Sequence, residues 1–512
     1  MTRFQTLLGC SAFALLSSAH FATADVTPND VWQDWRDHIQ SIGYSLTAKE
    51  STSGNTLTVS DLRLDLAMDP DQGDMSVTLG SIGFAQNDDG SVTVLFPPVM
   101  PVSVSVSPAT GQGEPVTMTL TINQSAQDMV VSGTPTNMTS SYSAGMVGLT
   151  LDQLTVGSET VGPENAKMAI TMQDVQSRTD SKLASMRDYD QTATIGSATY
   201  EMRFKDPNEP AIATVQGTSA NLGFKANGIM PLALAQASDT AGLLRAGMDV
   251  AGTVTAGNST MTLNIEDPVS GDMAIAMAAE SGTLAVETSA DGFSYAGTRE
   301  GMTVSLQPPQ FPFLLSFAMD NAAFNLSAPV MRSDAPQNFA LGLNLTDFTM
   351  SDLVWGMLNP QGTLPRDPAT VALDMTGTAT LLADYLDMQN ADQMSDAMDV
   401  PAKPESVKLN SLIVDALGAR LTGYGAATFD NSGTDTQDGT LKPTGAVDLK
   451  LVGGNTLINS LVEAGLLPDQ MAMGARMVMG MFTIPGDGED TLETKIEFTR
   501  SGAILANGQR IK

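Results

Sequence analysis

Few side chains in this sequence could carry acid–base or nucleophilic chemistry. Among 512 residues there are two histidines and one cysteine. A Ser-His-Asp or Cys-His site needs a nucleophile beside a base that titrates near the working pH. His38 lies at the edge of an amphipathic helical stretch next to Trp35, so we interpret it as a half-buried packing residue. A glycosidase-like pair of carboxylates stays possible, because 57 acidic residues offer many pairs, but none can be selected. We assign no catalytic residue.

Three segments hold side chains that could bind a metal ion. Met473, Met477 and Met481 fall on one face of a predicted helix, and thioethers suit Cu(I). The same helix has a second apolar face, which favours burial on both sides with methionine filling irregular gaps; an adaptable surface for lipid or protein is a third interpretation. The acidic turns 69–74 and 487–490 lack the spacing of a calcium loop, so we interpret both as solvated turns. We assign no metal and no cofactor.

Most of the chain alternates apolar and polar residues with period two, which is typical of half-buried strands. The clearest examples are residues 56–60, 102–106, 116–122, 261–265, 341–345, 371–375 and 494–498. Dipeptides typical of tight hairpins separate such runs at Asp89-Gly90, Asn227-Gly228, Asp291-Gly292, Asp438-Gly439 and Asn507-Gly508. The fold class predicted is mainly β, with large curved antiparallel sheets whose apolar face must be covered.

Helices are predicted at a few places. Thr27 and Pro28 begin one that carries an apolar stripe and ends at Gly43. Shorter helices are predicted over residues 240–248 and 351–358, and a helical hairpin over 455–482. In that hairpin we expect Asn455 to cap the first helix. Residues 384–404 are acidic and aperiodic, which indicates a linker.

We expect two related lobes, residues 25–236 and 237–512. The segments 90–101 and 301–312 share a glycine, a leucine and three prolines at a constant offset, which suggests a duplicated helix-then-sheet unit. The alternative is that each Pro-Pro pair marks the end of a strand.

Residues 1–24 have the layout of a secretory signal peptide. Arg3 precedes an apolar run, and Ala22-Thr23-Ala24 fits a cleavage site that follows Ala24. A lipobox at Cys10 would leave too short a leader, and an uncleaved membrane anchor is a weaker alternative because the apolar run is short. Cleavage would leave no cysteine and His38 as the one histidine. We therefore expect a periplasmic or secreted protein without disulfide bonds.

The charge balance limits the partners. A formal net charge of −32 argues against nucleic-acid binding and against electrostatic docking on anionic membranes. Beyond the leader no segment is apolar enough for a membrane helix, so a polytopic membrane protein is not expected.

The C-terminal run from Ser406 to Lys512, together with the start of the expected mature chain at 25–51, resembles a family of secreted bacterial proteins known as domain-of-unknown-function family 2125. The resemblance is most specific at Gly465–Pro468, at Pro485–Gly488 and at the closing Ala506-Asn507-Gly508-Gln509. It implies export and an envelope location, and it brings no catalytic residues. The element order is also similar to that of larger envelope proteins whose curved sheets hold lipid.

Taken together, these patterns favour a non-enzymatic exported envelope protein that offers an apolar groove or surface to lipid or to a protein partner. A structural or adhesion-like β scaffold with a closed core is the alternative. An uncharacterised carboxylate-dependent hydrolase is the second alternative.

Overall fold

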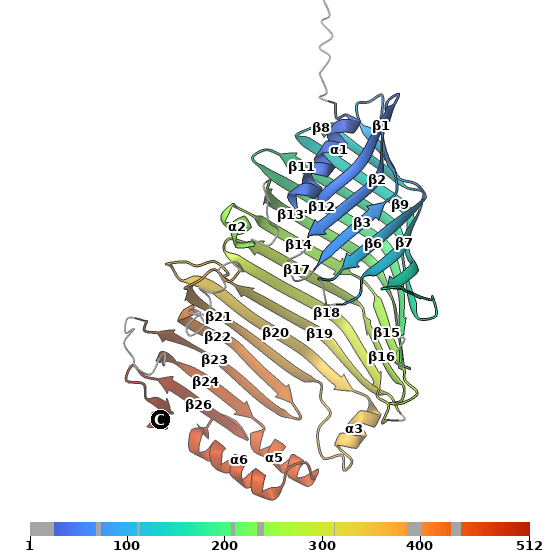
Figure 1. Ribbon diagram of the computed structural model, residues 1–512. Coiled ribbons are helices and arrows are strands. Elements are labelled where there is room, and N and C mark those ends of the chain that lie inside the picture. Colours follow the sequence, from blue (N-terminus) through green and yellow to red (C-terminus); the bar gives the residue numbers. More distant parts are fainter. Residues whose placement is uncertain are drawn as a thin grey trace, which may run out of the picture.

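The computed structural model describes residues 25–67, 73–109, 113–205, 210–232, 240–311, 313–386, 402–431 and 442–512. The predicted signal peptide, the acidic turn at 69–74 for the most part, the Asp438-Gly439 turn and most of the predicted linker lie outside these residues. The predicted fold class is confirmed: the chain is 64% strand and 12% helix, and its strands pair antiparallel (Figure 1).

The strands form one 28-stranded sheet. They are β1 (Ser45–Ser53), β2 (Thr56–Ala67), β3 (Asp74–Leu79), β4 (Ile82–Gln86), β5 (Val92–Leu95), β6 (Val99–Ser107), β7 (Val116–Ser125), β8 (Asp128–Thr134), β9 (Asn137–Val156), β10 (Glu159–Val161), β11 (Ala166–Leu183), β12 (Met186–Lys205), β13 (Ile212–Pro231), β14 (Asp249–Ala256), β15 (Ser259–Glu266), β16 (Met273–Ala279), β17 (Ser281–Ser289), β18 (Gly292–Gln307), β19 (Leu315–Ala328), β20 (Gln337–Met350), β21 (Ala369–Leu381), β22 (Ala402–Ala416), β23 (Ala419–Phe429), β24 (Pro443–Val452), β25 (Ile484–Pro485), β26 (Thr491–Phe498), β27 (Ile504–Ala506) and β28 (Gln509–Arg510).

The sheet is a long meander in which some positions are shared by two short strands. β3 and β4 both pair with β2, β7 and β8 both pair with β9, and β14 and β15 both pair with β13. From β18 to β24 each strand pairs with the next along the chain. β13 thereby joins the two expected lobes by direct hydrogen bonding, so both belong to one continuous sheet and the division into related lobes stays a prediction.

Several long strands contain one interior residue with a left-handed backbone. These residues are Asp174 in β11, Asn221 in β13, Gly301 in β18 and Asp347 in β20, with φ angles of 53°, 50°, 57° and 56°. Asp, Asn and Gly tolerate this conformation best. We call this line of residues the crease, because each strand bends there and its apolar residues change from odd to even numbers or the reverse.

The first helix, α1 (Pro28–Ser41), forms as predicted. The Thr27 side chain accepts a hydrogen bond from the Asp30 backbone N–H, and Asp30 accepts in return from the Thr27 N–H. Trp32 is almost fully buried, and the Trp32 and Trp35 rings pack on Phe84 with centroids 6.1 and 5.4 Å away. The core around α1 is built from β2, β4, β5, β8 and β9.

The other predicted helices are confirmed as α2 (Thr240–Arg245), α3 (Asp352–Leu358), α5 (Gly454–Glu463) and α6 (Asp469–Phe482). The predicted Asn455 cap is wrong. α5 begins at Gly454, and the Asn455 and Thr456 backbone N–H groups donate to the carboxylate of Asp490 at 3.1 and 2.8 Å. None of the helices in the described residues is both long and apolar enough to cross a bilayer.

Two further expectations were wrong. Asn227-Gly228 is not a turn but lies inside β13, where a side chain at Gly228 would meet the Asp249 carbonyl at 2.6 Å, so close approach of β14 explains the glycine. The methionine-rich helix is not buried on both sides, because Met473, Met477 and Met481 are 63%, 61% and 63% exposed. Both Pro-Pro pairs do follow strand ends, at Leu95 in β5 and Gln307 in β18.

Candidate functional site

The sheet has an inner face, on which α1 packs, and an outer face. In an antiparallel ladder, directly paired residues project from the same face. Met129 of β8 packs against the α1 core and is therefore an inner residue. Its ladder partners lead through Tyr142, Ser177 and Ala193 to Phe224 of β13. The inner face can thus be followed, strand by strand, away from α1.

From Phe224 onward the inner residues form an apolar row across ten strands. Each of the following residues is paired directly with the next: Phe224, Val254, Leu284, Gly297, Phe324, Leu343, Leu373, Leu412, Gly423 and Leu449. A parallel row on the same face runs through Val286, Tyr295, Leu326, Leu341, Met375, Leu409, Gly425, Val447 and Ile496. We call the surface that bears these two rows the first wall.

The strand segments beyond the crease carry a third apolar row. Its residues are Met100, Ile122, Leu149, Ile170, Tyr200, Gly217, Met261, Met277, Val304, Phe317 and Met350. Leu62, which belongs to the α1 core, connects through Leu79 to Val102, two residues from Met100, so this row is also inner. We call it the second wall. The two walls lie on the same inner face, on either side of the crease, and we call the inner surface that they form together the groove.

The residues between these inner positions face outward and are largely polar or small. On the strands of the first wall they include Thr253, Thr283, Thr298, Asn344 and Asp374, which line a separate depression on the outer face. Ion pairs also lie on this side, for example Lys450 with Glu493 at 3.1 Å. The strands therefore separate charge from apolar surface, as a sheet with one wet and one apolar face requires.

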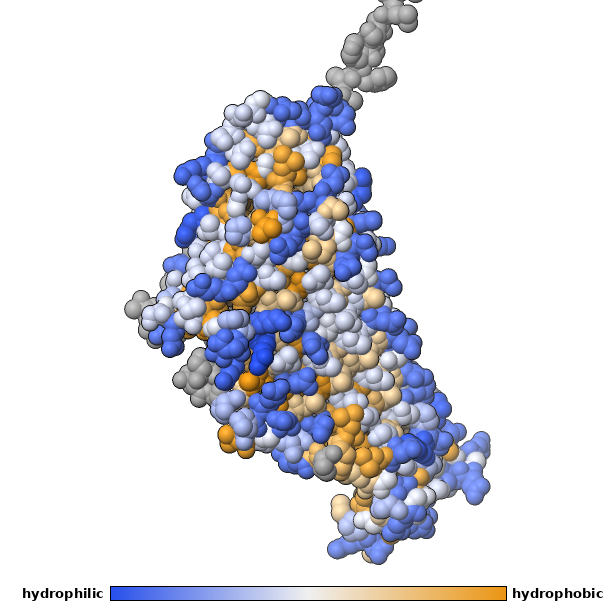
Figure 2. Space-filling model, turned by 90° about the vertical axis from the view of Figure 1, so that its right-hand side faces the viewer, coloured by the Kyte–Doolittle hydropathy of each residue, from blue (hydrophilic) through white to orange (hydrophobic). Residues whose placement is uncertain are grey.

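The first wall is open rather than filled. Leu284 is 43% exposed and Phe324 is 45% exposed, although both lie in the middle of the apolar row. Together with Val254 and Leu343 they line a cavity of ≈ 400 Å³ on the inner face. Figure 2 shows several clusters of apolar side chains along one side of the molecule, with hydrophilic side chains between them and at the margins. At ~4.8 Å between strands, the ten-strand row is roughly 40 Å long.

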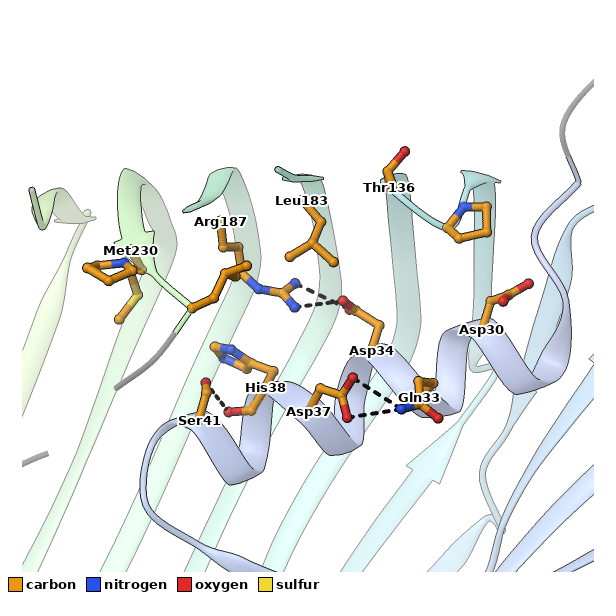
Figure 3. Close-up of a pocket in the computed structure, with 13 residues that line it drawn as sticks. Asp30, Gln33, Asp34, Asp37, His38, Ser41, Thr136, Leu183, Arg187 and Met230 are labelled. Atoms are coloured by element: carbon orange, nitrogen blue, oxygen red, sulfur yellow. Dashed lines mark hydrogen bonds and ion pairs between the residues drawn. The ribbon is translucent and has the colours of Figure 1, made fainter. Parts of the chain in front are cut away.

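Helix α1 closes the groove at the N-terminal end. One side of α1 is buried on the first strands, and on the other side Asp34 forms an ion pair with Arg187 of β12, with Oδ1 2.6 Å from Nη2 (Figure 3). The space between α1 and the ends of β11, β12 and β13 measures ≈ 410 Å³. Near the same strand ends, Leu244 of α2 packs with Met248 and Val330 in a small core, and Gly247, which follows α2, lies beside Met186 at the start of β12.

His38 faces this N-terminal cavity and is half-buried, as predicted. Burial, and to a lesser degree the Arg187 guanidinium, lower the pKa of His38, while Asp34 raises it by a smaller amount. Burial and Arg187 therefore favour the neutral imidazole. Ser41 uses its hydroxyl to donate to the His38 carbonyl at 2.7 Å, so the nearest hydroxyl on α1 serves the helix end. The geometry provides packing and closure rather than an activated nucleophile.

Three charged side chains occur on the inner face of the described strands. Glu50 accepts a hydrogen bond from the Trp32 indole at 2.6 Å, and Arg187 pairs with Asp34. Arg299 of β18 lies on the first wall and has no hydrogen bond or ion pair within the described residues. No group of three or more His, Cys, Asp and Glu converges in this part of the chain. The Asp490 carboxylate, at the acidic turn 487–490, accepts hydrogen bonds from Asn455 and Thr456 at the start of α5.

The residues singled out from the sequence do not come together. His38 lies on α1, the methionines lie on α6, and Asp490 binds the start of α5. The sequence did not identify the residues of the first wall as a site. Four of them lie in the period-two runs 341–345 and 371–375, which predicted strands. A scan against family models and a search of curated proteins found no match for this chain. The resemblance to family 2125 thus stays a prediction.

Proposed function

We propose that the protein is a non-enzymatic, exported envelope protein that binds the acyl chains of lipids in the groove that its two walls form. The observation that carries this proposal is the unbroken apolar row from Phe224 to Leu449, whose central side chains are exposed to solvent. A monomeric protein seldom exposes so long an apolar surface unless that surface binds something.

The chemistry of the groove favours acyl chains over a polypeptide. The walls present side chains, while the backbone groups of the neighbouring strands are used in the ladders. A peptide laid across Leu284, Phe324 and Leu343 would bury its own N–H and C=O groups against carbon, which costs free energy. An acyl chain has no such groups. The closed-core scaffold is less well supported, because these three side chains are exposed.

The dimensions are also compatible with lipid. The hydrocarbon core of a bilayer is ~30 Å thick, so one acyl chain spans about 15 Å. The row of roughly 40 Å could therefore hold more than one chain in line.

A pair of charge substitutions tests the proposal. In Leu284→Glu/Leu343→Glu, two carboxylates enter the groove at exposed positions, so the fold tolerates them while acyl burial becomes unfavourable. Native mass spectrometry of protein purified from membranes should show acyl species bound to the wild type and at least about tenfold less on this variant.

The matched control is Ala285→Glu/Asn344→Glu, which adds the same charge to the same strands at residues that line the outer depression. It should keep the bound acyl species. A wild type that carries no lipid, or an outer-face control that loses lipid as completely as the groove variant, would contradict the proposal.

A further inference from the structure

Arg299 is the charged residue that interrupts the apolar first wall. The ladder pairs Arg299 with Gly282 of β17 and with Ala322 of β19, which places all three on the inner face. The next residue, Glu300, points outward, where its carboxylate accepts a hydrogen bond from Ser281 at 2.7 Å. The nearest acid along the strand is therefore on the opposite face, and Arg299 has no partner in the described part of the chain.

The surroundings of Arg299 leave room for its guanidinium and for a ligand. A side chain at Gly282 would meet Arg299 Cδ at 2.7 Å and Nη1 at 2.8 Å, so the arginine lies over this glycine. The next inner residue beyond Gly282 is Ala256, which is also small. Gly301 of the crease follows two residues after Arg299. Arg299 is thus two residues from the crease, its guanidinium extends over Gly282 of β17, and the Glu280 side chain packs against Gly301 without forming an ion pair to Arg299 in the described part of the chain.

The same cavity of ≈ 400 Å³ is lined by Arg299 and by the apolar residues Leu284, Phe324 and Leu343. A cation at one side of an apolar surface matches an amphiphile with an anionic end. A guanidinium can bind a carboxylate or a phosphate through two parallel N–H donors, and it is less strongly hydrated than an ammonium group.

We propose that Arg299 binds the anionic head group of an acyl amphiphile whose chain lies on Leu284, Phe324 and Leu343. This inference rests on the proposed function and adds the class of ligand. The shared chemistry is one anionic oxygen group on an acyl chain, whether the carboxylate of a fatty acid or the phosphate of a phospholipid.

The test compares three probes of equal chain length, used below their micellar concentrations: dodecanoate, dodecyl phosphate and dodecan-1-ol. Isothermal titration calorimetry at low salt should show wild-type protein binding an anionic probe about tenfold more tightly than the alcohol, which is ~1.4 kcal/mol. In Arg299→Gln this preference should vanish while the affinity for the alcohol stays the same. The anionic probe whose affinity for the wild type exceeds that of the alcohol by the larger factor identifies the head group as carboxylate or phosphate.

Arg500→Gln is the matched control, because it removes one positive charge from an exposed turn outside the groove. It should keep the preference for the anionic probe. Equal affinity of the wild type for the anions and the alcohol, or a preference that survives Arg299→Gln, would overturn this inference and leave the apolar groove intact. Failure of all three probes to bind would overturn the groove as well.

Discussion

At the scale of single residues, Asp490 connects two distant parts of the C-terminal region. Its carboxylate accepts four hydrogen bonds from Asn455 and Thr456 at the start of α5. Burial alone raises the pKa of Asp490, but these hydrogen bonds outweigh it and hold the pKa below its ordinary value. The cap therefore comes from a residue 34 positions after Thr456, which a local search for capping residues does not find.

We expect Asp490→Ala to lower the free energy of unfolding by roughly 1–2 kcal/mol, as loss of a helix cap does. Asp490→Asn should lose less, because Asn tolerates the left-handed backbone at this position (φ 45°) and keeps one acceptor. Urea unfolding of the three proteins measures the difference. No loss in the alanine variant would show that the cap is dispensable.

The same residue predicts a dependence on pH. Because the folded pKa of Asp490 is depressed, its stabilisation is complete above the unfolded pKa of ~3.9 and is lost as the pH falls through the folded pKa. The difference in stability between wild type and Asp490→Ala should therefore be constant near neutral pH and shrink below about pH 4.

A further test at the scale of single residues concerns His38. The pKa of His38 is lowered first by burial and then by Arg187. In Arg187→Met the second cause is removed while Asp34 remains, so the pKa of His38 should rise. NMR titration of the imidazole measures this directly, and an unchanged pKa would show that Arg187 has no electrostatic effect on the ring.

At the scale of elements, the crease determines how the strands form two walls. Asp347 lies within β20 with a positive φ, at the point where the register with β21 shifts between Leu345 and Phe348. Asp347→Val should destabilise the protein by about 1–2 kcal/mol, because a β-branched residue resists the left-handed region. Asp347→Gly should be close to neutral. Thermal unfolding compares them, and equal loss in both variants would assign the effect to the aspartate side chain instead.

Many elements were predictable because their signals are local. The period-two runs 102–106 and 116–122 became β6 and β7, and Thr27 with Pro28 marked the start of α1. The register was not predictable, since alternating runs of similar composition can pair in many ways and each choice satisfies the same pattern. The crease was not predicted either, because an Asp or Asn within a strand is interpreted as an outward-facing polar residue unless its φ angle is known.

At the scale of the whole molecule, the distribution of charge explains how one chain combines a large negative charge with an open apolar surface. The sequence has a net charge of −32, and among the described strands the first wall holds one charged side chain, Arg299, while the other acidic and basic side chains lie mainly at outer positions. The charged side chains that favour solubility and the apolar side chains of the groove thus lie on opposite faces of the same strands. The composition predicted the negative charge and the period-two alternation predicted an apolar face, but which residues of different strands share that face depends on register.

The meander from β18 to β24 has a consequence for the length of the apolar row. Successive strands alternate in direction, so removing any adjacent pair, such as β20 and β21, would leave β19 and β22 correctly oriented to pair and would place Phe324 beside Leu412. Each such pair adds about 10 Å of groove. The number of hairpins therefore sets the length of the apolar row. Adding or removing a hairpin would change that length in steps of two strands.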